Sequence, residues 1–183
     1  YSLPPIQKKL IKLCRKAGKP VVVATQMLES MIEYPSPTRA EVSDVAQAIY
    51  EGADAVMLSA ESASGKYPIQ AVKMMDNVAK EIESDDSFRQ IIETSRSEIG
   101  TDTSNAITVA AREVSERTLV KAICCFTHSG TTAILTSRER PKIPIIALTP
   151  ELSIARRLAL NWGLHCIVTE KVNRFKQAVI KAV

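Results

Sequence analysis

The stretch that decides the fold of this 183-residue chain is Lys19-Pro20-Val21-Val22-Val23-Ala24-Thr25-Gln26-Met27-Leu28-Glu29-Ser30-Met31. Its β-branched run has no polar alternation, which is typical of a strand covered on both faces in the parallel sheet of an α/β protein. In such sheets, ligands bind at the carboxyl ends of the strands, where loops and helix N-termini present N–H groups. The strand expected over Pro20–Ala24 ends at Thr25 and Gln26, so we expect a functional site there.

Helices are predicted on either side of this strand. The opening helix ends at Gly18 and Pro20, because glycine favours a helix end and proline cannot continue a helix. After the strand, Thr38 and Glu41 match a capping box, which starts a helix that ends near Gly52. The apolar stripes expected for these two helices are Ile6, Leu10, Leu13 and Ala17, and then Val42, Val45, Ala46 and Ile49.

A second buried strand is expected over Ala53–Leu58, followed by a loop of small residues from Ser59 to Gly65. Pro68 suits the first position of the next helix. The inward stripe expected for that helix is Ile69, Val72, Met75, Ala79 and Ile82. Two parallel strands cannot bury their own edges. Because residue 1 is Tyr1 rather than methionine, we also expect the chain to be a piece of a longer protein.

The acidic stretch Glu83–Ser87 is the predicted domain boundary, dividing the chain into residues 1–83 and 84–183. Beyond it, the pattern predicts an open α/β sheet with right-handed crossovers. The final helix, expected from about Arg174, carries no stop signal, so this second domain is also expected to be truncated. The elements expected after the boundary are helices near Phe88–Ile92 and Ile107–Val114, strands Lys121–Thr127, Ile143–Leu148 and His165–Thr169, and helices Ser129–Ser137 and Glu151–Leu160.

The composition indicates a globular protein, with 45% hydrophobic residues and a formal net charge of +4. This mild charge gives no case for nucleic acid or for a membrane surface as a partner. The sequence shows neither a membrane-spanning apolar run nor a signal peptide, so a cytoplasmic protein is expected. The four cysteines lack the spacing of a zinc site or a redox dithiol and are expected to be reduced. The adjacent Cys124 and Cys125 are expected to point to opposite faces of a strand.

Three blocks in one order resemble pyruvate kinase: the opening stretch, Pro37–Glu41, and Ala53–Glu61. The resemblance runs from about Ile6 to Ile82 and continues more weakly through Phe126–Thr132 and beyond. It implies that the first two βα units are the last two of an eightfold β/α barrel, followed by the family's C-terminal α/β domain. The six missing units would precede this chain.

The resemblance implies that Thr25 binds the carboxylate of phosphoenolpyruvate or pyruvate, with Gln26 beside it. The alternative is that Thr25 only caps the short helix after the strand. The loop at Ser59 and Glu61 resembles the family's loop near ADP or ATP, although Ala60 replaces a common glycine. A plain solvated loop is the alternative there.

Arg39 resembles the family's arginine at a subunit contact. The resemblance also implies a homotetramer. The alternative for Arg39 is an exposed, solvated arginine. Glu41 needs no role beyond its capping box. The resemblance also implies Mg²⁺ and K⁺ as cofactors. No pair of acidic residues here has the spacing of a metal site. The resemblance places the metal-binding carboxylates and the catalytic lysine upstream of this chain. We therefore expect this piece alone to have no turnover.

The sequence Thr127-His128-Ser129-Gly130-Thr131-Thr132 links a strand to a helix N-terminus. A glycine, hydroxyl groups and a helix dipole favour phosphate. The position resembles the loop that binds the phosphate of a sugar-phosphate effector in regulated pyruvate kinases, with His128 where some relatives have lysine. Arg157 and Trp162 could join this pocket or serve packing and solvation. A free-standing sugar-phosphate-binding module is the competing function, and an α/β scaffold without a ligand is a third.

Overall fold

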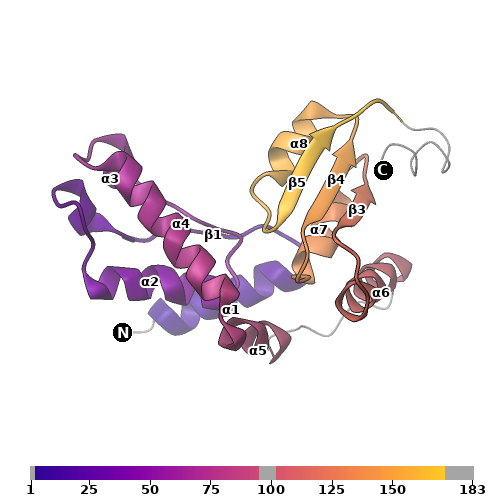
Figure 1. The fold of residues 1–183 in the computed structure, drawn as a ribbon, viewed down its shortest axis with the longest axis horizontal. Helices are drawn as coiled ribbons and strands as arrows, with labels where there is room; N and C mark the ends of the chain where they lie inside the picture. Colours follow the sequence, from indigo (N-terminus) through magenta and orange to yellow (C-terminus); the bar gives the residue numbers. More distant parts are fainter. Residues whose placement is uncertain (1–2, 95–101, 172–183) are drawn as a thin grey trace. The chain divides into compact units, whose positions relative to one another are not determined.

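The computed structural model describes residues 3–94 and 102–171 of the chain, shown in Figure 1. It divides into two compact units, of which the first comprises Tyr1–Arg15 and Pro20–Arg96 and the second Lys16–Lys19 and Ser97–Val183. Each unit has its own apolar core and its own parallel strands. Parallel sheets and flanking helices confirm the predicted α/β class. Within the described residues, no helix is both long and apolar enough to cross a bilayer.

Two short strands and the helices around them form the first unit. Strand β1 pairs in parallel with β2, with Val22 opposite Ala55 and Val23 opposite Val56. Both strands are shorter than predicted, because regular pairing extends over only these two residues of each. The elements are α1 (Leu3–Lys16), β1 (Val22–Val23), η1 (Glu29–Ile32), α2 (Arg39–Tyr50), β2 (Ala55–Val56), α3 (Ala60–Ala63), α4 (Pro68–Ser84) and α5 (Asp86–Thr94).

The core of the first unit lies between β1, the segment after it, and helices α2, α4 and α5. The predicted inward stripe of α2 is confirmed, with Val45 and Ile49 buried. Helix α5 contributes Phe88 and Ile92, each 1% exposed, to this core. The predicted boundary at Glu83–Ser87 overlaps the end of α4 and the start of α5, and the first unit continues beyond it.

Three apolar features of the first unit differ from the prediction. Val22 is 42% exposed, so β1 is not covered on both faces. On α1, Ile6 and Leu10 are about half exposed, and the buried residues are Ile11 and Arg15. On α4, Ile69 and Val72 are exposed. The prediction was wrong here because, in the part of the chain that the structure describes, these sides of β1, α1 and α4 face no second packing layer.

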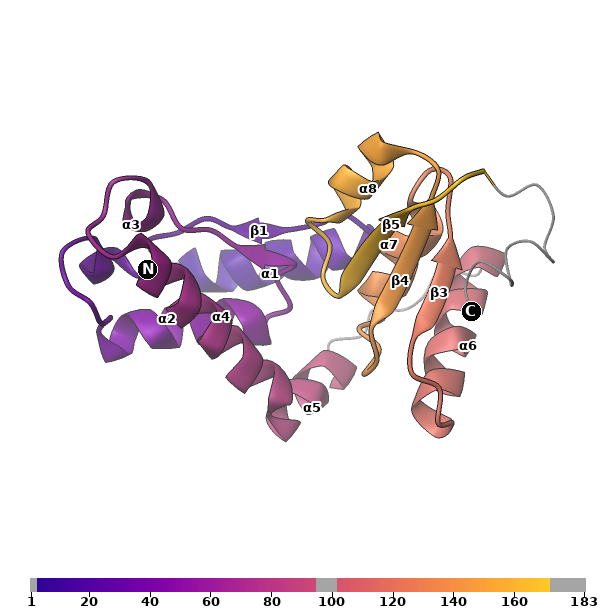
Figure 2. The same cartoon turned by 45° about the horizontal axis from the view of Figure 1, so that its top comes forward.

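The second unit contains a three-stranded parallel sheet in the order β3-β4-β5 (Figure 2). The register places Cys125 beside Ala147, and Ala147 beside Cys166. The spatial order and the parallel pairing of these strands match the predicted open α/β sheet. The elements are α6 (Thr103–Arg117), β3 (Ile123–Phe126), α7 (Thr131–Arg138), β4 (Ile145–Thr149), α8 (Leu152–Leu158) and β5 (Leu164–Val168). The predicted helix from Arg174 lies outside the described residues.

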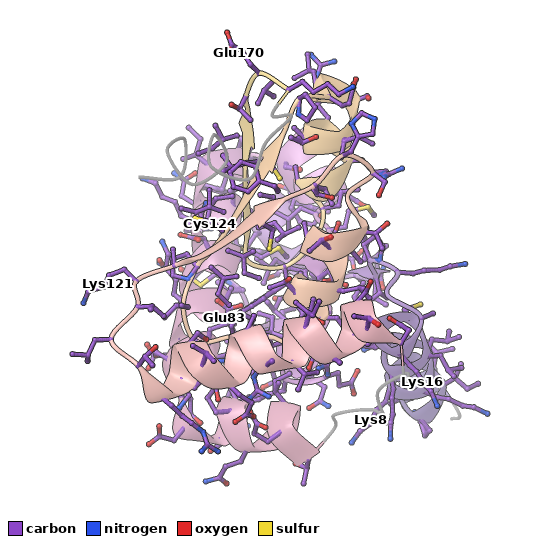
Figure 3. The ribbon with its side chains drawn as sticks, turned by 90° about the vertical axis from the view of Figure 1, so that its right-hand side faces the viewer. Lys8, Lys16, Glu83, Lys121, Cys124 and Glu170 are labelled. Atoms are coloured by element: carbon purple, nitrogen blue, oxygen red, sulfur yellow. The ribbon has the colours of Figure 1, made fainter. Side chains whose placement is uncertain are left out.

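Helices α7 and α8 cover one face of this sheet. Ala133 of α7 and Leu158 of α8 pack with Cys125, Ile145 and Ala147 in a single apolar cluster. On the other face, Cys124 and His165 are exposed; Figure 3 labels Cys124 on its strand. The expectation that the adjacent cysteines point to opposite faces is confirmed, and both thiols are free. Burial raises the pKa of the Cys125 thiol.

Helix α6 packs its polar face inward. Arg112 is 1% exposed, and its Nε donates to Glu116 Oε1 at 2.9 Å. Arg138 of α7 donates to Asn105 Oδ1 at 2.6 Å, which joins the two helices through polar groups. The apolar residues Ile107 and Val114 are 60% and 56% exposed. The apolar residues that predicted this helix are therefore exposed, and its polar residues are the ones packed against the rest of the unit.

Candidate functional site

A cavity of about 200 Å³ lies beside the carboxyl ends of the two strands of the first unit. The four residues singled out at these strand ends all border it, although they come from loops more than thirty positions apart. Parallel pairing of β1 with β2 causes this, because it brings both strand ends to the same edge. The lining residues are Ala24, Thr25, Gln26, Glu29, Ile32, Ser59, Ala60 and Glu61.

Thr25 and Gln26 are exposed and line the cavity, and the two residues that follow them are buried. Met27 and Leu28 follow them and are 1% and 0% exposed, so the turn cannot lift without losing buried apolar surface. The Thr25 hydroxyl lies 3.9 Å from Met27 Sδ, which is a weak acceptor. A hydroxyl held in this way remains able to donate to an anionic ligand.

Ser59 and Glu61 also line the cavity, from the segment that follows β2. Ser59 is exposed, whereas Glu61 is 4% exposed. One carboxylate oxygen of Glu61 accepts the Leu28 N–H at 3.2 Å, and the other accepts the Ser59 N–H at 2.8 Å. Glu61 therefore connects the two strand-end loops from inside. No local sequence pattern indicates this contact, because Leu28 and Glu61 lie 33 positions apart.

Gly65 closes the short helix α3 that carries Glu61. Its N–H donates to the Ala60 carbonyl at 2.7 Å. A Cβ on residue 65 would lie 2.7 Å from the Glu61 carbonyl oxygen and 3.2 Å from that of Ala60. Real Cβ atoms do not approach backbone so closely, so only glycine fits here without a shift of the loop.

The predicted capping box is present at the start of α2. Thr38 Oγ1 accepts the Glu41 N–H, and the Glu41 carboxylate accepts the Thr38 N–H at 2.7 Å. The same carboxylate also accepts the N–H and the hydroxyl of Ser30, at 2.7 and 2.6 Å. Partial burial acts to raise the pKa of Glu41, but the hydrogen bonds from Ser30 and Thr38 outweigh it and lower this pKa to about 2. Glu41 thus does more than cap a helix, because it also holds the segment after Thr25.

Arg39 is the first residue of α2 and is exposed. Its carbonyl accepts the Ser43 hydroxyl at 3.0 Å, an ordinary contact within a helix. Arg39 does not line the cavity. Its position beside Thr38 links it through the capping box to Glu41 and Ser30.

In the second unit, the predicted phosphate cradle joins β3 to α7. Gly130 has φ +92°, in the left-handed region that favours glycine, and its N–H donates to Thr127 Oγ1 at 2.9 Å. The hydroxyls of Ser129 and Thr131 lie 3.0 Å apart and are exposed. The first N–H groups of α7 have no acceptor within the helix, which is a favourable setting for an anion.

Arg157 contacts this cradle, because its guanidinium donates to the Ser129 carbonyl. Trp162 has a packing role instead, since Arg140 stacks on its ring at 4.8 Å and Ser137 donates to its carbonyl at 2.5 Å. A cavity of about 220 Å³ adjoins the cradle at the ends of all three strands. Its lining is Phe126, Thr127, His128, Leu148, Pro150, Thr169, Glu170 and Lys171.

The residues that the structure describes do not fit a divalent metal. No group of three or more histidine, cysteine, aspartate or glutamate side chains is placed to hold an ion within residues 3–94 and 102–171. Of the two carboxylates at the first cavity, Glu61 already accepts two N–H groups, which leaves Glu29. One remaining carboxylate cannot by itself form an all-protein Mg²⁺ site, and such an ion would take its other oxygen ligands from water and phosphate.

Two family models match the chain. Residues 1–72 match "Pyruvate kinase, barrel domain", and residues 105–183 match "Pyruvate kinase, alpha/beta domain". The two matches follow the two units in order and cover both cavities.

Curated relatives and a solved structure match over nearly the whole chain. A pyruvate kinase of Methylorubrum extorquens is 48% identical over 181 residues, and one of Agrobacterium vitis is 47% identical over 181 residues. Each match covers 99% of this chain but 38% of the relative, so the chain spans well under half their length. The crystal structure of a pyruvate kinase from Cryptosporidium parvum matches with a TM-score of 0.90 and 38% identity, covering 99% of this chain and 37% of the other.

Proposed function

This chain belongs to the pyruvate kinase family, and on that premise we propose that it forms part of an enzyme that transfers the phosphoryl group of phosphoenolpyruvate to ADP. The observation that carries the proposal is the cavity at the ends of β1 and β2, which Thr25, Gln26 and Ser59 line together. Strand ends of a β/α barrel are where its ligands bind. The cavity therefore lies where the substrates of such an enzyme would meet.

In this proposal Thr25 is the substrate-binding residue. Its exposed hydroxyl donates to the carboxylate of phosphoenolpyruvate or pyruvate, and Gln26 contributes a second polar group. Ser59, with Glu61 in the same loop, is assigned to the binding of ADP or ATP, and the lining of the same cavity by both residues supports this. Binding and orientation of this kind lower the barrier by holding the reactants in line.

The chemical step itself needs groups that this part of the chain does not provide. Phosphoryl transfer needs cations between the phosphates and carboxylates to hold them. The family resemblance suggests that the ligands of Mg²⁺ and K⁺ lie upstream of this sequence. We therefore expect no pyruvate formation by the 183-residue chain, in an assay coupled to lactate dehydrogenase with both ions present. Sustained turnover by the purified chain would refute this expectation.

Titration of the ¹⁵N-labelled chain with phosphoenolpyruvate tests the binding role directly. Amide resonances of Thr25, Gln26 and Ser59 should shift in wild type. Thr25→Ser, which keeps the hydroxyl, should retain the response, and the near-isosteric Thr25→Val should weaken it about tenfold, as expected for loss of one hydrogen bond to a charged group. Shifts confined to other regions, or an equal response from both variants, would remove Thr25 from the substrate site.

The second unit is proposed to bind a phosphorylated effector, such as a sugar phosphate, at Thr127, Ser129, Gly130, Thr131 and Thr132. The arrangement of hydroxyls, a left-handed glycine and a helix N-terminus supports this. Inorganic phosphate should shift the amides of Thr131 and Thr132. Ser129→Ala should weaken that response without shifting the amides at the first cavity.

The family resemblance further suggests a homotetramer in the cytoplasm, with Arg39 at a subunit contact. The exposure of Arg39 at the start of α2 is compatible with such a contact. Sedimentation of the purified chain beside Arg39→Ala tests this, since a contact residue should change the distribution of oligomers.

A further inference from the structure

Glu61 is the most enclosed charged side chain at the first cavity. It borders the cavity but is 4% exposed. Its two oxygens accept N–H groups from two different loops, Leu28 after β1 and Ser59 after β2. A buried carboxylate is stable only when such hydrogen bonds compensate for the lost water.

These two contacts set the distance between the walls of the cavity. Leu28 ends the turn that begins at Thr25, and this turn is anchored from below by the buried side chains of Met27 and Leu28. Ser59 lies in the segment after β2, two positions before Glu61. The side chain that accepts from both loops therefore fixes the position of the exposed hydroxyl on each wall.

From this geometry we infer that Glu61 is a positioning residue, which holds the Thr25 turn in register with the Ser59 loop, and that it does not itself contact the nucleotide. A contact with a nucleotide would need an accessible carboxylate, whereas Glu61 is 4% exposed and each of its oxygens accepts a backbone N–H group. A carboxylate would also repel phosphate. The inference rests on the proposed function only for the identity of the ligand.

Glu61→Gln is the sharpest variant, because it preserves the shape of the side chain and changes its hydrogen bonding. A glutamine has one acceptor oxygen and one donor NH₂, so it can accept only one of the two N–H groups. The other N–H then faces a donor in a buried site. Glu33→Gln is the matched control, because it removes the same charge from an exposed pair with Lys66 in the same unit.

Hydrogen exchange measured by NMR on the full 183-residue chain tests the inference. In Glu61→Gln, protection of the Leu28 or the Ser59 amide should fall about tenfold or more, as expected for loss of a hydrogen bond to a buried charge. Amides of α2 and α4 should keep their protection, and Glu33→Gln should leave Leu28 and Ser59 unchanged. Full protection of both amides in Glu61→Gln would overturn the inference.

Phosphoenolpyruvate titration of the same variants separates the inference from the proposed function. If the ligand shifts Thr25 and Gln26 in wild type, Glu61→Gln should bind about tenfold more weakly, since misplaced binding groups lose affinity. Equal binding by wild type and Glu61→Gln would overturn the positioning role. If wild type does not respond at all, the proposed substrate site fails, and the exchange data alone decide whether Glu61 holds the two loops.

Discussion

Replacing Glu41 by glutamine should destabilise the first unit in a way that depends on pH. The Glu41 carboxylate accepts four hydrogen bonds, from the N–H and hydroxyl of Ser30 at 2.7 and 2.6 Å and from those of Thr38 at 2.7 and 2.8 Å. Partial burial opposes ionisation, but these bonds outweigh it, so the pKa of Glu41 falls from 4.5 to about 2. Glutamine cannot accept on both terminal atoms, so the variant loses part of this set.

The magnitude follows from the lowered pKa. A folded-state pKa below the unfolded value means that the stabilisation is complete above pH 4.5 and is lost as the pH falls toward 2. Such a shift corresponds to about 3 kcal/mol of unfolding free energy. Because Glu41 is partly exposed, solvent screening reduces the expected contribution to about 1–2 kcal/mol.

Urea unfolding at pH 7 and pH 3, followed by far-UV circular dichroism, provides the assay. The deficit of Glu41→Gln relative to wild type should be about 1–2 kcal/mol at pH 7 and less than half of that at pH 3. Fluorescence of Trp162, the one tryptophan of the chain, reports on the second unit and should be unchanged. Glu33→Gln should change stability by less than about 0.5 kcal/mol. A deficit of equal size at both pH values would refute the reasoning.

Three further predictions concern single positions. Gly65→Ala should destabilise the first unit by about 1–3 kcal/mol in urea unfolding, because its Cβ would meet the Glu61 carbonyl at 2.7 Å; unchanged stability would show that the loop can yield. Thr127→Val should cost about 1–2 kcal/mol, because the Gly130 N–H loses its acceptor, whereas Thr127→Ser should recover most of this loss. The exposed Cys124 should react with a thiol reagent well before its buried neighbour, as mass spectrometry of the labelled peptides would show.

Local signals in the sequence predicted the local parts of the fold. The capping box at Thr38 and Glu41 formed as expected, because both partners lie within one turn of each other. The meeting of Thr25 with Ser59 was also predictable, since parallel strands in successive βα units bring their carboxyl ends together.

Long-range contacts could not be predicted in the same way. The bonds from Leu28 to Glu61 and from Ser30 to Glu41 depend on where whole loops come to lie, and no spacing rule encodes this. The spacing of apolar residues also gave the wrong buried face for α6, where Arg112 is buried and Ile107 is exposed. Polar pairing to a neighbouring helix decided the packing there, and apolar patterns do not record it.

The contact between Glu61 and Leu28 also bears on how this family can vary. Its donor is a backbone N–H, which every residue except proline supplies, so no side chain at position 28 can compensate for a change at position 61. A pair such as Arg138 and Asn105 can instead be exchanged, because each partner is a side chain. Methods that infer contacts from correlated substitutions should detect the second kind of contact and overlook the first. Residue 61 would be held constant by purifying selection without any partner position changing in step.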